Sequence, residues 1–370
     1  MISNIHLVGP MILIGAFLLT NFIIPKIIWI VNRRNFIDQP DYRSSHEKST
    51  PTMAGFSFFL VCVMLTFVLK TWDADAVGIN FIAGVTMVFA VGLKDDLVGA
   101  SPRAKMMGQL LAISFVLFSN CIEISSLHGF LGIDSIHYVF SYILMGGIML
   151  AIINSYNLID GIDGLASIIG IVIFIAYAVF FFFVGMFFYF LFSLGFIGML
   201  VAYLRFNFSS SKKIFMGDTG SLIVGFCIAF LTAKFISADT LPFAGIIFKV
   251  ENKIIVAFSI LCIPLFDTIR IIGVRLLNGK SPFFSDRNHI HHVLIDSKLA
   301  HYKVSLVLAL LNIFVIILFT GLSFYFDSYQ MVILFAVFFL SLLVVFNQLK
   351  RNIKYKNSFR HIIKFVNFIF

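Results

Sequence analysis

Long apolar segments, separated by short polar breaks, follow one another along almost the entire chain. Of its 370 residues, 60% are hydrophobic and 12% are charged, which excludes a soluble domain and indicates a chain dissolved mostly in lipid. A helix needs about 20 apolar residues to cross the hydrocarbon core of a bilayer, and the segments have about this length. The sequence therefore predicts an all-α polytopic membrane protein with about eleven transmembrane helices. The predicted spans are residues 5–31, 53–70, 77–93, 105–120, 137–155, 165–184, 187–206, 221–238, 253–273, 304–325 and 330–350.

The predicted organisation is one transmembrane domain at residues 1–350 and a basic cytoplasmic tail at 351–370. The first span lacks the positive n-region and cleavage site of a signal peptide, so we expect it to be retained. In the tail, Phe359, Ile362, Ile363 and Val366 recur at helical spacing between basic residues. This spacing is typical of an interfacial helix, and a disordered tail is the open alternative.

The positive charges favour one orientation in the membrane. On the predicted topology, 23 of the 27 Lys and Arg residues fall on one face or in the tail. The positive-inside rule then places the N-terminus outside and the C-terminus in the cytoplasm. The other face holds only Lys70, Lys234, Lys249 and Lys253.

The stretch from Asn154 to Gly164 places two amides, two carboxylates and two glycines at the end of an apolar span. Carboxylates at a membrane boundary are costly unless positive charge compensates them, and a divalent cation is the expected compensation. The glycines allow the backbone to turn and to approach a ligand closely. A capped helix end followed by a polar turn is the simpler alternative.

Two further acidic motifs fall on the same predicted cytoplasmic face. Asp95 and Asp96 are adjacent at a helix end, where they repel each other unless a cation lies nearby, and their oxygens suit Mg²⁺ or Mn²⁺. The Gly217–Ser221 sequence is expected to form a flexible loop whose amides hold a phosphate while Asp218 binds a metal. A solvated helix terminus and a plain N-cap loop are the respective alternatives.

Three histidines, His289, His291 and His292, lie within four residues and cannot share one helical face. We therefore expect a loop that presents imidazoles to a ligand, with zinc as an alternative that lacks a fourth ligand. Asp267 and Arg270 are spaced i, i+3 near the inner end of a span, where they can pair on one helix face. Two interpretations of this pair stay open: it contributes to the functional site, or it is only an ion pair buried in the membrane.

Basic residues on this face suit an acidic substrate, above all a phosphate. For Lys212, Lys213 and the tail, membrane topology alone is the preferred explanation. Two classes of protein then compete: an enzyme that joins a phosphorylated donor to a lipid acceptor, and a transporter of an anionic solute. A transporter would hold its ionisable residues near the middle of the bilayer, whereas here they cluster at helix ends, which favours the enzyme. The basic residues in question are Lys48, Lys105, Arg270, Arg275 and Arg287.

The ordered motifs resemble the polyprenyl-phosphate N-acetylhexosamine-1-phosphate transferase family (glycosyltransferase family 4) over about residues 10–320. The resemblance implies transfer of a sugar-1-phosphate from a UDP-N-acetyl sugar to undecaprenyl phosphate, with Mg²⁺ and release of UMP. The motifs that carry it are Lys48–Gly55, Asp95-Asp96, Asn154–Leu165, Phe215–Leu222, Pro264–Thr268 and Ser281–His292.

The histidine motif indicates a branch of this family. The muramoyl-pentapeptide transferases have three consecutive histidines, whereas this chain reads His289-Ile290-His291-His292. That form is similar to the WecA/TagO-type branch, which uses UDP-N-acetylglucosamine to begin O-antigen, teichoic acid and related cell-envelope polymers. Another UDP-N-acetyl sugar and UDP-N-acetylmuramoyl-pentapeptide stay open as donors.

The resemblance also implies residue roles. Asn157 and Asp218 would contact the metal, Mg²⁺ or Mn²⁺, and the diphosphate. Asp95, sometimes proposed as the base, would lie with Asp96 near the lipid phosphate. The implied catalytic residues are Asp95, Asp96, Asp160, Asp163, His291 and His292, and the implied substrate-binding residues are Lys48, Lys105, Asn154, Asn157, Arg287 and His289.

The expected partners are a UDP-N-acetyl sugar, undecaprenyl phosphate and membrane lipid, with no nucleic acid and with a homodimer left open. The expected location is the bacterial cytoplasmic (inner) membrane, with the active site on the cytoplasmic face. A lipid phosphate is mostly dianionic at neutral pH, so direct attack on the donor is preferred over a covalent aspartyl intermediate.

Overall fold

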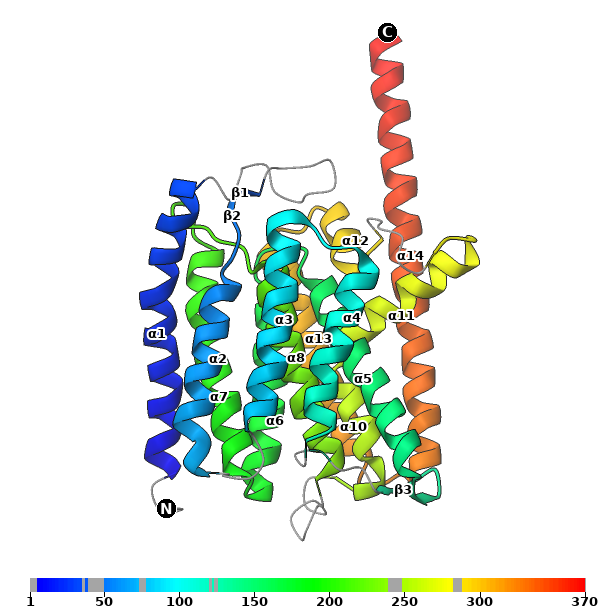
Figure 1. Ribbon diagram of the computed structural model, residues 1–370. Helices are drawn as coiled ribbons and strands as arrows, with labels where there is room; N and C mark the ends of the chain where they lie inside the picture. The colour runs from blue at the N-terminus through cyan, green and yellow to red at the C-terminus, as the bar shows by residue number, and fades with distance from the viewer. Residues whose placement is uncertain are drawn as a thin grey trace.

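Long helices run side by side through the computed structural model, which describes residues 5–34, 37–38, 50–72, 78–119, 122, 126–238, 248–281 and 288–369 (Figure 1). The α-helices are α1 (Ile5–Arg34), α2 (Gly55–Leu69), α3 (Ile79–Val98), α4 (Pro102–Leu117), α5 (Tyr138–Ile159), α6 (Leu165–Val184), α7 (Phe187–Asn207), α8 (Gly217–Ser237), α10 (Lys253–Ile260), α11 (Cys262–Leu277), α12 (Ile290–Asp296), α13 (His301–Leu322) and α14 (Ser328–Ile369). The 3-10 helices are η2 (Lys70–Trp72) and η3 (Val250–Asn252). Two small antiparallel sheets pair β1 (Ile37–Asp38) with β2 (Thr50–Pro51) and β3 (Ser126–Phe130) with β4 (Ile133–Ser135).

Each predicted span coincides with a helix, except that residues 253–273 form α10 and α11, which meet at a bend of 71°. Seven of the described helices are long and apolar enough to cross a membrane, or eight if the bent pair is one span. The remaining candidates are shorter or charged: α2 has 15 residues, and α3 carries Lys94-Asp95-Asp96 near its C-terminal end. The all-α polytopic fold is therefore confirmed, and the count of eleven spans stays a prediction.

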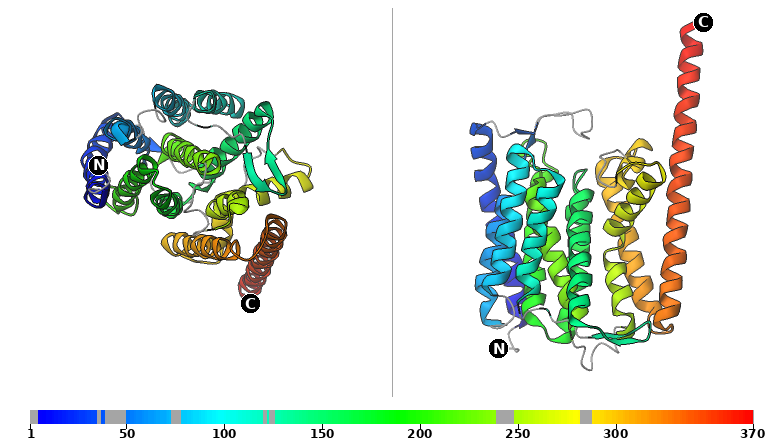
Figure 2. Two further views of the ribbon diagram at one scale, coloured as in Figure 1. Left: turned by 90° about the horizontal axis from the view of Figure 1, so that it is seen from below. Right: turned by 45° about the vertical axis from the view of Figure 1, so that its right-hand side comes forward.

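Helix α8 is enclosed by the other helices, as the view from below shows (Figure 2). It packs against α2, α3, α5, α6 and α10, and nearly all its side chains are buried. Two glycines permit this close packing, because a Cβ at Gly55 or Gly92 would collide with the backbone of the first turn of α8. The far end is capped by the buried Lys253 ammonium, which donates to the carbonyls of Ile236 (3.3 Å) and Ala238 (2.5 Å).

The polar motifs gather at one end of the bundle, here called the motif face and defined by Asp95-Asp96, Asn157–Gly164, Gly217–Ser221 and His289–His292. Helices α3 and α5 end at this face, and α4, α6 and α8 begin there (Figure 1). Helix α14 continues to Ile369 beyond the same end, whereas α1 starts at the opposite end. The structure thus brings motifs from distant parts of the sequence to one end, as the sequence predicts.

Candidate active site

A short turn between α3 and α4 brings Asp95 and Lys105 together. Gly99 ends α3 at a φ of 74°, a conformation that costs little only for glycine. The Ala100 amide donates to Asp95 Oδ1 at 2.7 Å, and the Ser101 hydroxyl caps α4 by accepting from the Ala104 amide. The turn holds the Asp95 carboxylate beside the first turn of α4, which carries Lys105.

The Lys105 ammonium lies at the centre of the site, surrounded by oxygens from α3, α5 and α8. Its Nζ is 2.8 Å from Asp95 Oδ2, 2.8 Å from Asp218 Oδ1 and 3.2 Å from Asn157 Oδ1. All four side chains are only partly exposed, so these charges interact more strongly than an ion pair in open water. Four helices, α3, α4, α5 and α8, therefore meet where the positive charge of Lys105 faces the negative charges of Asp95 and Asp218.

Asn157 is fixed by both ends of its amide. While its oxygen accepts from Lys105, its Nδ2 donates to Asp218 Oδ1 at 2.5 Å and to Ser221 Oγ at 2.7 Å. One turn earlier on α5, Asn154 pairs with the buried Gln109 of α4: Asn154 Nδ2 donates to Gln109 Oε1 at 2.8 Å. The predicted substrate-binding residue Asn154 thus links α5 to α4.

Asp96 caps the N-terminus of α8. Its carboxylate accepts from the Asp218 amide (2.8 Å), the Thr219 amide (3.0 Å) and the Thr219 hydroxyl (2.5 Å). The expected flexible loop at Gly217–Ser221 is wrong, because these residues form the first turn of α8. The expectation that its amides hold a phosphate is wrong for Asp218 and Thr219, because both donate to Asp96.

The Asp160–Gly164 turn links α5 to α6 and carries two acids in different surroundings. Burial, together with the negative charges of Asp218, Asp96 and Asp163, raises the pKa of Asp160 to about 7. Among the described residues, no side chain forms a hydrogen bond or ion pair with its carboxylate. Asp160 is thus an acid of the site without a positively charged partner in the part of the chain that the structure describes.

Asp163 is held by residues that lie far away in the sequence. Its Oδ2 is 2.7 Å from Lys213 Nζ and 3.4 Å from His301 Nδ1, and its carbonyl accepts from the Ser305 hydroxyl at 3.0 Å. Although burial acts in the opposite direction, the bonds from His301 and Lys213 lower the pKa of Asp163. Topology alone is therefore the wrong explanation for Lys213, which forms an ion pair.

The histidines lie partly in a short helix and not in a loop as expected. His289 precedes α12, and His291 and His292 belong to its first turn. A Cβ at Gly161 would collide with His291 Nε2, so the imidazole lies directly against the Asp160–Gly164 turn. Burial and the neighbouring His292 lower the pKa of His291 to about 3, so this imidazole is neutral at physiological pH.

Asp267 joins the histidines to α11. Its Oδ2 lies 2.8 Å from His289 Nδ1, and its Oδ1 lies 3.2 Å from Arg270 Nη2, which confirms the predicted i, i+3 pair. The structure thus brings six of the predicted residues together in one cluster: Asp95, Asp96, Lys105, Asn154, Asn157 and Asp218. It places His291 against Gly161, with the rings of His289 and His292 beside that of His291. Lys48 and Arg287 lie outside the described residues.

Sequence reasoning missed several partners of the site. Gln109 could have been identified from the sequence, because a glutamine in an apolar span, one turn after Lys105, needs a hydrogen-bonding partner. Lys213 and His301 could not, because the sequence does not distinguish a basic residue that sets the membrane orientation from one that forms an ion pair. Ser221 and Thr219 were visible only as parts of a motif.

The donor set of the central cluster fits a divalent cation. In the described parts of the chain, no three His, Cys, Asp or Glu side chains gather closely enough to bind a metal by themselves. The carboxylates of Asp95 and Asp218 and the amide of Asn157 nevertheless direct oxygens at one point, where the Lys105 ammonium supplies the positive charge. Oxygen ligands of this kind are those that Mg²⁺ and Mn²⁺ prefer.

The fold and the site define an integral membrane protein with a charged, oxygen-rich cluster at one end of its helices. The sequence profile of glycosyl transferase family 4 matches residues 78–236 of the chain. The matched region contains Asp95, Asp96, Lys105, the Asn154–Gly164 stretch and Asp218.

Several curated proteins are similar over most of their length. An undecaprenyl-phosphate alpha-N-acetylglucosaminyl 1-phosphate transferase of Escherichia coli O157:H7 is 28% identical over 308 residues, which cover 81% of each chain. A decaprenyl-phosphate N-acetylglucosaminephosphotransferase of Mycobacterium tuberculosis H37Rv is 27% identical over 317 residues, 80% of this chain and 78% of the relative. A Yersinia pestis protein with the first of these names is 28% identical over 283 residues, or 74% of each chain.

Proposed function

We propose that this protein transfers N-acetylglucosamine-1-phosphate from UDP-N-acetylglucosamine to undecaprenyl phosphate and releases UMP. The observation that carries the proposal is the Lys105 cluster, in which residues of four helices converge within the region matched by the family profile. The names of the similar proteins support the sugar-phosphate group and the polyprenyl-phosphate acceptor. The product would be the first lipid-linked sugar of a cell-envelope polysaccharide, such as O-antigen or teichoic acid.

In the proposed reaction an oxygen of the lipid phosphate attacks the β-phosphorus of the donor. One phosphorus–oxygen bond forms, the bond to the oxygen that bridges the two phosphates breaks, and UMP leaves with that electron pair. Phosphoryl transfer depends on alignment and on charge neutralisation more than on covalent help from the protein. Lys105 supplies positive charge at the cluster, and Asn157, whose amide also donates to the Ser221 hydroxyl, holds the Asp218 carboxylate in place.

Asp218, Asn157 and Asp95 are the residues that would hold Mg²⁺. The bound ion would supply charge neutralisation for the phosphate oxygens. Asp160 lies near the negative charges of Asp218 and Asp96 and has no positive partner among the described residues, so it is a further group that a cation would compensate. The His289–His292 segment, which lies against the neighbouring turn, would contact the sugar or the diphosphate.

The substrates suggest where the reaction occurs. Undecaprenyl phosphate keeps its chain in the bilayer while its head group lies at the interface, and a UDP-sugar arrives from the cytoplasm. The motif face is also the end where α14 leaves the bundle and where most positive charges are predicted. The proposed location is therefore the bacterial inner membrane, with the motif face in the cytoplasm.

The test is UMP release by purified protein in detergent, with undecaprenyl phosphate, Mg²⁺ and UDP-N-acetylglucosamine. Other UDP-N-acetyl sugars and UDP-N-acetylmuramoyl-pentapeptide are supplied in parallel, and Asp218→Ala is the inactive comparison. We expect release that requires lipid, metal and Asp218. Absence of UMP release with every donor, from protein shown to be folded, would contradict the proposal and favour transport of an anionic solute.

A further inference from the structure

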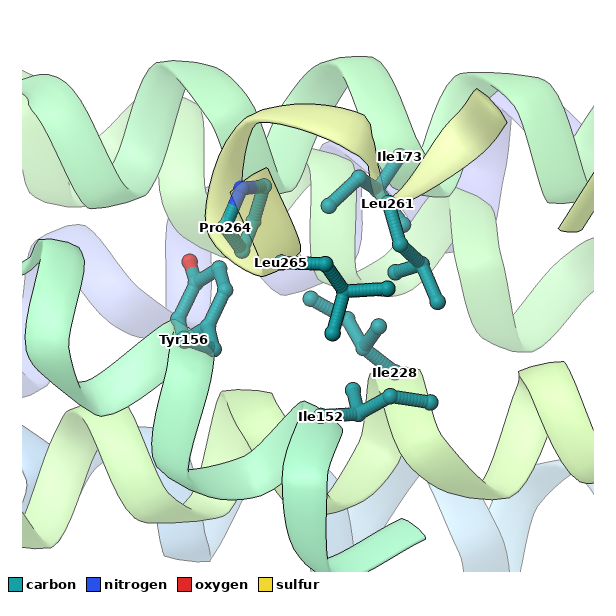
Figure 3. A pocket seen from close by; sticks show the side chains of 7 residues that line it. All are labelled: Ile152, Tyr156, Ile173, Ile228, Leu261, Pro264 and Leu265. Carbon is teal, nitrogen blue, oxygen red and sulfur yellow. The ribbon is translucent and has the colours of Figure 1, made fainter. Parts of the chain in front are cut away.

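The bent helix pair α10–α11 holds an acidic residue near the histidines. Beyond the bend, Pro264 and Leu265 lie in the first turn of α11 and line a small pocket together with Ile152 and Tyr156 of α5 (Figure 3). Ile173 of α6 and Ile228 of α8 line the same pocket. Because four helices meet here, the start of α11 is fixed relative to α5, and Asp267 follows Pro264 by one helical turn.

The Asp267 carboxylate is almost fully buried and accepts three hydrogen bonds. Oδ2 faces His289 Nδ1 at 2.8 Å, and Oδ1 accepts from the Ile290 amide at 2.9 Å and from Arg270 Nη2 at 3.2 Å. Arg270 Nη2 also donates to the Asn288 carbonyl. One acidic side chain thus fixes both the imidazole of His289 and the backbone at the start of α12.

The geometry determines which nitrogen of His289 carries a proton. The adjacent Arg270 guanidinium favours the ionised form of Asp267, and an ionised carboxylate can only accept hydrogen bonds. His289 Nδ1 must therefore donate, which leaves Nε2 as the nitrogen directed away from Asp267. A carboxylate that orients an imidazole in this way also fixes the rotation of the ring.

The orientation of His289 is transmitted to the site through ring contacts. The rings of His289 and His291 are stacked, with centroids 5.4 Å apart and planes inclined by 14°. His291 in turn lies against Gly161, where no side chain could fit between the imidazole and the backbone. A change in the His289 ring would therefore displace His291 from the Asp160–Gly164 turn.

We propose that Asp267 is a positioning residue that holds His289 as the Nδ1-protonated tautomer and thereby sets the His289–His292 segment against the Asp160–Gly164 turn. Its kinetic consequence rests on the proposed transferase function, whereas the tautomer does not. Asp267 acts through His289 and need not touch either substrate.

The first test is the ¹⁵N NMR spectrum of histidine-labelled protein in detergent, in which His289 is assigned by the signals lost in His289→Gln. We expect a protonated Nδ1 in the wild-type protein. In Asp267→Asn an amide nitrogen can replace Oδ2, so Nδ1 should become an acceptor and lose its proton. An unprotonated Nδ1 in the wild-type protein would overturn the proposal, whether or not the variant folds and whether or not the protein releases UMP.

The second test is a double-mutant cycle on steady-state UMP release. Asp267→Asn should lower kcat/KM for UDP-N-acetylglucosamine by about tenfold or more, as is common when a residue that orients a histidine is changed. The KM for undecaprenyl phosphate should change less than about twofold. In a His289→Gln background the effect of Asp267→Asn should disappear.

Thr268→Val is the matched control, because this neighbour on α11 has a buried hydroxyl without a hydrogen-bond partner among the described residues. It should leave both the spectrum and the kinetic constants close to those of the wild type. An Asp267→Asn effect that persists unchanged in the His289→Gln background would show that Asp267 does not act through His289 and would refute the proposal.

Discussion

Lys105 places one ammonium where two carboxylates and an amide oxygen converge. Asp95 and Asp218 each lie 2.8 Å from it and would repel each other without it. The same oxygens are the expected ligands of a divalent cation, so the Lys105 ammonium and a bound metal would both neutralise the charge of Asp95 and Asp218. This competition has a measurable consequence.

We expect Lys105→Met to lower the free energy of unfolding of the metal-free protein by roughly 1–2 kcal/mol, because two partly buried carboxylates lose their counter-charge. Its Tm should fall accordingly by a few degrees. Added Mg²⁺ should then raise the Tm more in the variant than in the wild type, since the ion replaces the lost ammonium. The measurement is thermal unfolding in detergent with EDTA or Mg²⁺. The exposed Lys94→Met is the control, and an equal or smaller Mg²⁺ effect in Lys105→Met would contradict the interpretation.

Asp160 and Asp163 should respond oppositely to amide substitution. Because the folded-state pKa of Asp160 is raised to about 7, the folded protein loses stability relative to the unfolded chain as pH rises from about 4 through 7. Asp160→Asn should remove this loss and raise the Tm at pH 7, by about 2–4 °C if the effect is on the order of 1 kcal/mol. We expect a flatter dependence of Tm on pH between 5 and 8, measured in EDTA.

Asp163→Asn is the matched comparison, because bonds from His301 and Lys213 lower the pKa of Asp163. The ionised form stabilises the fold above the ordinary pKa of an aspartate, and this stability is lost as pH falls through the lowered value. At pH 7 Asp163→Asn should therefore lower the Tm. If both variants shift the Tm in the same direction at pH 7, the assigned electrostatic environments are wrong.

Between helices, the amides of Gln109 and Asn154 hold the register of α4 against α5. Lys105 lies one turn before Gln109 on α4, and Asn157 lies about one turn after Asn154 on α5. The bridge therefore sets the position from which Lys105 reaches Asn157.

We expect Gln109→Leu and Asn154→Leu each to lower stability by about 1–3 kcal/mol, because each removes the hydrogen bonds between the two amides. The loss should be larger in Asn154→Leu, which leaves the buried Gln109 amide without this partner, whereas Asn154 keeps its bond to the Leu150 carbonyl in Gln109→Leu. The double variant should lose less than the sum, since neither amide is then left unpaired. Unfolding of all four proteins in denaturant gives the coupling directly. Strictly additive losses would show that the bridge does not stabilise the helix pair.

The helices could be predicted from the sequence because each depends mainly on its own apolar run. The start of α8 could not, because its first turn is capped by Asp96, a residue more than 100 positions earlier. The contacts of Asp163 with Lys213 and His301 could not be predicted for the same reason, because they join three segments that are distant in the sequence. The central residues were nevertheless identified, because unpaired acids and amides at the ends of apolar spans need an explanation.

For the whole molecule, the four motifs of the motif face lie at the end from which α14 emerges (Figure 1). The opposite end carries β3, β4 and few basic residues. Since positive charge is retained on the cytoplasmic side of a membrane, this asymmetry predicts the orientation of the whole bundle. A donor nucleotide made in the cytoplasm could then reach the site without crossing the membrane.

Single cysteines test this orientation in intact cells with a membrane-impermeant maleimide. Cys62, Cys227 and Cys262 are buried, so Cys121→Ser is a suitable background for exposed reporters at Asp134 on β4 and at Ser210 between α7 and α8. We expect Asp134→Cys to be labelled in intact cells and Ser210→Cys only after permeabilisation. The reverse pattern would place the motif face outside the cell, where a cytoplasmic UDP-sugar could not reach it, and would contradict both the orientation and the proposed site of reaction.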